Sequence, residues 1–181
     1  MRQAGNPAGM RNPVPRRTGR WLAAALTGGI VMLAGCSGGN VATKTMTQAQ
    51  AATRAEQVLA GTAAAVKPRP RLDFDPRLGN GADQCLASIP NATEMVNVSR
   101  TAWLRQIPTS ENGSVGQQIL AFWKKQGYKI TDYSGFSAGK PSIDAETKDY
   151  FTISLGTASN GLMSIGATSP CIYKNGTPPA S

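Results

Sequence analysis

The sequence predicts an α+β domain in which a mostly antiparallel sheet of about five strands is covered on one face by two helices. Two segments carry apolar residues at helical spacing, and five shorter segments alternate apolar with polar residues. Their order along the chain is α-β-β-α-β-β-β, which is typical of a mostly antiparallel sheet with helices packed on one face. The 181 residues are enough for one domain. We expect it to occupy residues 47–175, followed by a disordered tail at 176–181.

The first helix is expected over residues 47–66. Thr47 and Gln50 have the spacing of a capping box, in which each side chain accepts a hydrogen bond from the backbone of the other residue. Small and apolar residues then recur at helical spacing and predict a narrow buried face: Ala51, Ala55, Val58, Leu59, Thr62 and Val66.

Two strands are expected between the helices. In RLDFDPR (71–77), Leu72 and Phe74 fall on one face and the charged residues on the other, which is typical of a half-buried edge strand. Residues 79–91 have no such pattern and are expected to form a loop that carries Cys85. The second strand spans 94–106; Trp103 lies opposite its apolar face, which consists of Val96, Val98, Ala102 and Leu104.

The second helix is expected to begin at Ser114, with Gln117 as its capping partner, and to end at Gly127 in the C′ position. YKITDY (128–133) follows as the third strand.

The last two strands are expected to form a hairpin with a three-residue loop at 159–161. This loop pairs Leu155 with Ile165 and places both apolar triplets on one face, whereas a two-residue turn would put them on opposite faces. Gly161 then takes the left-handed conformation that such loops require. The two triplets are Phe151, Ile153, Leu155 and Met163, Ile165, Ala167.

Positive charge gathers at the N-terminus. Five of the 19 basic residues precede Trp21, and no acidic residue precedes Glu56. From Cys36 onward the chain has 14 basic and 10 acidic side chains. This net charge of +4, without a basic stripe interleaved with aromatics, does not indicate nucleic-acid binding.

Residues 1–35 have the order of a cleaved signal peptide. A basic region is followed by an apolar segment at 21–33, which is shorter than the about 20 residues needed to cross a bilayer. The segment ends in LAGC, which resembles the lipobox of bacterial lipoproteins. The resemblance implies that Leu33, Ala34 and Gly35 are recognised by the signal peptidase and that the Cys36 thiol becomes a thioether to diacylglycerol.

Lipidation of Cys36 would hold the protein at the extracytoplasmic face of the cell membrane, with residues 36–46 as a lipidated cysteine and flexible tether. An ordinary thiol in an uncleaved anchor is the alternative. Arg16-Arg17 leaves a twin-arginine export signal open beside the general secretory route.

Cys85 and Cys171 are the remaining cysteines, and outside the cytoplasm an even pair predicts a disulfide. It would join an early loop to the final strand. Two free buried thiols are the alternative. Because the chain contains no histidine, two cysteines cannot complete an ordinary structural zinc site. We therefore expect neither a metal nor a cofactor.

Serine catalysis is disfavoured. GFSAGK (135–140) matches both a nucleophile elbow and an S-x-x-K motif at Ser137, but the chain has no histidine for a triad, and Pro141 stands where the elbow needs a helix. We interpret this segment as a turn between strands.

The carboxylates do not form a convincing acid-base pair either. Asp73 and Asp75 share a predicted strand face with Arg71 and Arg77, which would neutralise them. Asp144, Glu146 and Asp149 are interpreted as a solvated loop, since DAETKD lacks the glycine and the spacing of a calcium loop. We expect no catalytic residue.

Four aromatic residues, Trp103, Trp123, Tyr128 and Tyr133, are candidates for an aromatic groove that binds sugar or peptide. Core packing is the default for Trp123 and Tyr128, whereas Trp103, opposite the apolar face of its strand, is the candidate for surface binding.

Together, LAGC, FWKKQGYKI (122–130) and TSPCIYKNGTP (168–178) are similar to the small lipoproteins of streptomycetes and related actinobacteria. The resemblance covers residues 33–178. It implies a lipidated Cys36, a Cys85–Cys171 pair and no catalytic residue. The expected function is a membrane-anchored, non-catalytic binding or accessory role in the cell envelope, with an envelope protein or wall polymer as partner. A wall hydrolase or transferase that uses carboxylates or Ser137 is the alternative.

Overall fold

The computed structural model describes residues 45–85 and 94–178. The predicted signal peptide, its predicted recognition residues Leu33, Ala34 and Gly35, the predicted lipidation site Cys36 and the predicted tether up to residue 44 therefore lie outside the described residues. In the described ranges the elements are α1 (Gln48–Ala64), β1 (Arg71–Asp73), β2 (Gly81–Gln84), β3 (Met95–Arg105), α2 (Asn112–Lys125), β4 (Lys129–Ser134), β5 (Ser142–Glu146), β6 (Thr152–Thr157), β7 (Met163–Thr168) and β8 (Ile172–Tyr173).

The strands form one antiparallel sheet in the order β1-β3-β7-β6-β5-β4, and β2 and β8 also pair with β3. The α+β class is thus confirmed. The expected strand count and order are wrong, because the described residues contain eight strands. The additional strands are β2, β5 and β8.

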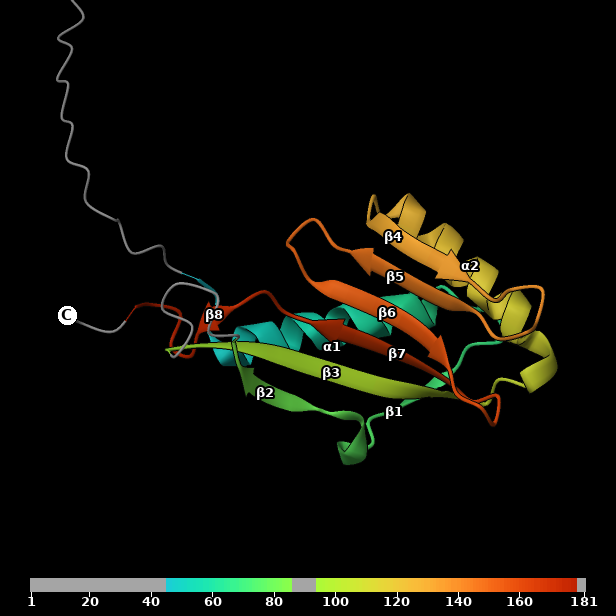
Figure 1. Ribbon diagram of the computed structural model, residues 1–181, viewed down its shortest axis with the longest axis horizontal. Coiled ribbons are helices and arrows are strands. Elements are labelled where there is room, and N and C mark those ends of the chain that lie inside the picture. Colours follow the sequence, from blue (N-terminus) through green and yellow to red (C-terminus); the bar gives the residue numbers. More distant parts are fainter. Residues whose placement is uncertain (1–44, 86–93, 179–181) are drawn as a thin grey trace, which may run out of the picture. The chain divides into compact units, whose positions relative to one another are not determined.

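Both helices pack on the same face of the sheet. The long helix α1 contacts β3 and β7, and α2 contacts β4 and β5; in Figure 1 both lie behind the strands. Alternate residues of the central strands face them and are buried, and the buried side chains of the helices belong to the same core cluster. Within residues 45–85 and 94–178, no helix covers the other face of the sheet, which we call the uncovered face.

The capping box and the buried face that the sequence predicts for α1 are confirmed. Thr47 is the N-cap, and both hydrogen bonds of the capping box with Gln50 are present. The predicted stripe is buried along its whole length, including Val66 just beyond the helix.

The start of α2 differs from the prediction. The helix begins at Asn112, directly after a short 3-10 helix at Thr109–Glu111, and no side chain caps it. Asn112 is buried, and its Nδ2 donates to the Gly161 carbonyl at 2.8 Å. A distant hairpin thus sets the first residue of α2, which no local signal could reveal. Its end is as predicted, with Gly127 at φ +73°.

The β6–β7 hairpin has the predicted register. Leu155 pairs with Ile165, and the N–H of Ala158 donates to the carbonyl of Leu162 around the three-residue loop. Gly161 has φ +81°, as the loop requires.

The segment RLDFDPR is a strand only in its first half. β1 ends at Asp73, and Asp75 accepts from the Arg77 N–H to cap a 3-10 helix at Pro76–Leu78. Phe74, expected on the buried face, is 41% exposed. Proline at the first helical position favours this turn over a continued strand.

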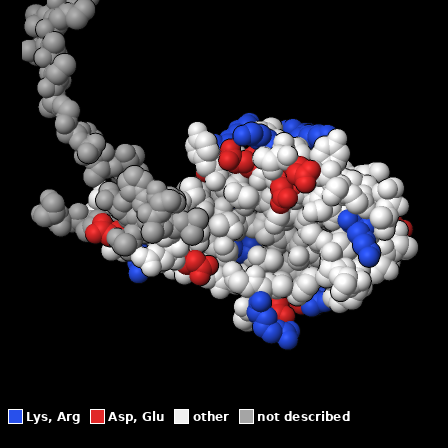
Figure 2. Space-filling model, in the orientation of Figure 1, with Lys and Arg blue, Asp and Glu red and all other residues white. Residues whose placement is uncertain are grey.

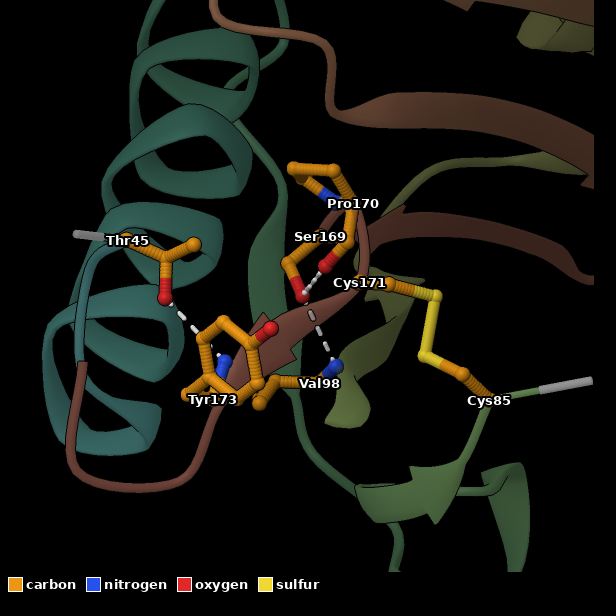
Figure 3. Close-up of a disulfide and its surroundings, with 7 residues drawn as sticks. All are labelled: Thr45, Cys85, Val98, Ser169, Pro170, Cys171 and Tyr173. Atoms are coloured by element: carbon orange, nitrogen blue, oxygen red, sulfur yellow. Dashed lines mark hydrogen bonds between the residues drawn. A yellow bond between two sulfur atoms is a disulfide. The ribbon is translucent and has the colours of Figure 1, made fainter. Parts of the chain in front are cut away.

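The disulfide between Cys85 and Cys171 is present (Figure 3), so the alternative of two free thiols is wrong. It joins the residue after β2 to the residue before β8, rather than a loop to the final strand. Beside it, Ser169 Oγ accepts from the Val98 N–H, and Tyr173 N donates to Thr45 Oγ1. Gly176, assigned to the tail by sequence, is buried and accepts a hydrogen bond from the Thr45 N–H at 2.8 Å.

Candidate functional site

Arg100 is the one charged residue on the helix-facing side of β3. Along this strand Val98 and Ala102 are buried, and residues two apart share a face, so Arg100 points toward α1. Its Nε donates to Oε1 of Glu56 at 2.9 Å and its Nη1 to the Ser99 carbonyl at 3.0 Å. The Arg100 side chain is 24% exposed and that of Glu56 is 53% exposed. The guanidinium therefore emerges from the edge of the core with its plane held in place.

Arg100 lies in a groove between the first half of α1 and the strands beside it, which we call the α1 groove. It consists of three adjoining hollows of about 380, 480 and 370 Å³ that all include Gln48. Arg100 lines the first two, Phe74 and Ala82 line the first, and Lys174 lines the other two. The hollows are within the size range of small-molecule sites.

The outer wall of the α1 groove is held by Asn80. Its Nδ2 donates to the carbonyls of Asp75 and Thr101, and its Oδ1 accepts from the Thr101 N–H at 2.6 Å. These bonds connect the corner between β1 and β2 to β3. The side of the groove that carries Phe74 is thereby fixed against the strand that carries Arg100.

The charges of the groove leave a surplus of one positive charge. Arg100 and Lys174 are cationic, and Glu56 is the only carboxylate among the described lining residues of the three hollows. A guanidinium near the protein interior interacts with anions more strongly than one in bulk water. The arrangement therefore suits an anionic group.

Trp103, the predicted surface residue, is half-buried on the opposite face of β3 and does not reach the α1 groove. Its ring lies 5.6 Å from the guanidinium carbon of Arg105, which pairs with Asp73 at 2.8 Å. Small residues lie beside it in register: Ser164 of β7 and, one strand further, Gly156 of β6.

The other three aromatic residues differ in how far they are buried. Trp123 is buried, and its Nε1 donates to Thr62 Oγ1 at 2.9 Å, while Tyr128 packs partly buried against the core. Tyr133 is 54% exposed, with Lys124 over its ring and Phe136 at its edge. The four aromatics do not form one groove.

Ser137 is exposed in the turn between β4 and β5, where the Lys140 N–H donates to the Gly135 carbonyl. Strands stand on both sides of this turn, whereas a nucleophile elbow connects a strand to a helix. The predicted turn is confirmed.

The carboxylates Asp73 and Asp75 are separated by the end of β1. Asp75 pairs with Arg77 as expected, and this guanidinium lowers the pKa of Asp75 to about 2. Asp73 pairs with Arg105 instead of Arg71. The two acids therefore do not converge on one substrate position.

DAETKD is not a loop throughout, because Asp144 and Glu146 belong to β5. They share the uncovered face of the sheet with their cross-strand neighbours Asp132 and Lys129. Figure 2 shows this face, with acidic side chains near the edge formed by β4 and β5. Asp149 in the following turn pairs with Arg54 of α1, which lowers the pKa of Asp149.

Within residues 45–85 and 94–178, no three His, Cys, Asp or Glu side chains gather as metal ligands would. The helices in these ranges are too short or too polar to span a membrane.

Comparisons with protein-family models, with curated proteins and with solved structures find no match to this chain.

Proposed function

We propose that this chain is a lipid-anchored, extracytoplasmic binding protein without catalytic activity, and that the α1 groove is its ligand site. The anchoring rests on the LAGC segment and its basic and apolar flanks. The Cys85–Cys171 disulfide supports an oxidising compartment, since such bonds are rare in the cytoplasm.

The observation that carries the binding role is the placement of Arg100. A half-buried guanidinium at an otherwise apolar position of a central strand has a desolvation cost. Its only carboxylate partner among the described residues is an exposed glutamate. A ligand that pairs with Arg100 would offset that cost.

Metabolic labelling with a clickable fatty acid tests the anchor in the full chain. We expect the wild-type protein to incorporate the label and to begin at Cys36 by mass spectrometry, and the Cys36→Ser variant to lose the label. The matched control is Cys85→Ser, Cys171→Ser, which retains Cys36 and the label. A mature chain that begins at another residue, or an unmodified Cys36 thiol, would contradict the proposal.

A further inference from the structure

We propose that the α1 groove binds a carboxylate carried on an apolar body, and that Glu56 occupies the place of that carboxylate when the groove is empty. This inference rests on the proposed binding role and names the chemical class of its ligand. It follows from the hydrogen bonds of Arg100, the exposure of Glu56 and the apolar wall opposite them.

The guanidinium of Arg100 is held ready for a carboxylate. Its Nη1 is bonded to the Ser99 carbonyl, which fixes the plane of the group, and its Nε is used by a single Glu56 oxygen. Nη2 makes no hydrogen bond to any residue in the described ranges. A ligand carboxylate could therefore use Nε and Nη2 together in the paired geometry that guanidinium and carboxylate prefer.

Glu56 is a weak competitor for this position. More than half of its side chain is exposed, so the ion pair with Arg100 is screened by water and its displacement is easy. Solvent can receive the released Glu56 carboxylate. Arg100 retains its bond to Ser99 during the exchange and does not need to be reoriented.

The apolar part of the ligand is indicated by the opposite wall. Phe74 is 41% exposed and lines the same hollow of about 380 Å³ as Arg100, together with Pro76 and Ala82. A phenyl or short alkyl body placed there would remove the Phe74 ring from water. The ligand class is thus an organic acid rather than a bare inorganic anion.

A second arginine on the molecule provides a matched control. Arg54 of α1 also pairs with a carboxylate, but both Nε and Nη2 are used, at 2.7 and 3.2 Å from the two oxygens of Asp149. Arg54 does not line the three hollows of the α1 groove. Substitution of Arg54 removes the same charge without changing the proposed site.

The test is a titration of the full chain, followed by NMR, with 3-phenylpropionate and with the neutral 3-phenylpropan-1-ol. We expect the carboxylate to shift the Arg100 Nε–H signal and the amide signals of Gly81 and Ala82. The dissociation constant should rise at least tenfold in Arg100→Met, fall several-fold in Glu56→Gln and stay unchanged in Arg54→Met.

Equal affinity of the wild type and Arg100→Met, equal binding of the alcohol and the acid, or weaker binding in Glu56→Gln would each overturn the proposal. Inorganic phosphate is the further arm: if it displaces the phenyl acid at equal concentration, the site selects a simple anion and the organic-acid class is wrong. Should Arg100→Met not fold, the dissociation constants of Glu56→Gln and Arg100→Lys for the phenyl acid test the proposal in its place. Fatty-acid labelling at Cys36 is independent of these outcomes, so a failed anchor and a failed ligand class are distinguishable.

Discussion

Arg100 breaks the alternation of β3 at a position where Val96, Val98, Ala102 and Leu104 share its face. The sequence contains this signal, because a charged residue in an otherwise apolar phase needs a partner or a function. The apolar pattern of this segment predicts the strand, and Arg100 is the exception within that pattern. The role of Arg100 depends on its pairing with Glu56, which is 44 residues away along the chain.

A buried polar pair connects the two helices at the residue scale. Thr62 of α1 and Trp123 of α2 are both buried, and Thr62 Oγ1 accepts from the indole N–H while it donates to the Val58 carbonyl. The hydroxyl thus satisfies a donor that core packing has removed from water.

Thr62→Val should lower the free energy of unfolding by about 1–3 kcal/mol, because the shape is retained but the indole N–H loses its acceptor. Urea denaturation measures the change. Thr62→Ser retains the oxygen and should recover most of the stability. A Val variant as stable as the wild type would show that the hydrogen bond contributes little.

At the scale of elements, the β6–β7 hairpin shows how register can be read from a sequence. Only one loop length aligns the two apolar triplets, and that loop needs a residue with positive φ, which Gly161 supplies. The tip also packs on the 3-10 helix that precedes α2, since a Cβ at Gly161 would lie 2.9 Å from Thr109 Cγ2.

Gly161→Ala should therefore destabilise the protein by at least about 1–2 kcal/mol, the cost of an L-residue in the left-handed region. Gly156→Ala is the matched control, because Gly156 has no positive φ and no atom within 4 Å of the added Cβ. Thermal unfolding of both variants compares them. Equal melting temperatures would mean that the hairpin tip does not require glycine.

The strands β2, β5 and β8 have no clear strand signal in the sequence, for physical reasons. β2 and β8 are short segments, and β2 has mostly exposed side chains, so they have little periodic signal and are strands because β3 offers them partners. β5 does alternate, with Ile143 and Ala145 buried, but Asp144 and Glu146 made the segment resemble a solvated loop. Carboxylates are compatible with a strand here because the uncovered face of the sheet accommodates them.

At the scale of the whole molecule, both ends of the described domain meet at one place. Thr45 is hydrogen-bonded to Tyr173 and Gly176, and the disulfide connects the nearby β8 segment to the end of β2. The bonded cysteines are 86 residues apart in sequence, so the disulfide restricts a large part of the unfolded chain.

Replacing both cysteines, Cys85→Ser with Cys171→Ser, should lower the free energy of unfolding by up to about 4.5 kcal/mol, the chain-entropy value for a loop of this length. Guanidinium denaturation with and without dithiothreitol provides the check. Reductant should destabilise the wild type by the same amount and leave the double variant unchanged. A wild type insensitive to reductant would contradict a stabilising role.

The sequence by itself determined the α+β class, the capping box of α1, the core face of β3 and the hairpin register, because each depends on residues close together in the chain or on one periodic pattern. Lipidation at Cys36 remains a prediction from sequence. Only the tertiary structure decided the pairing of β2 and β8 with β3, the start of α2 and the α1 groove. These features depend on partners that are far apart in sequence, such as Arg100 with Glu56 and Asn112 with Gly161, and they come together only when the helices pack on the sheet.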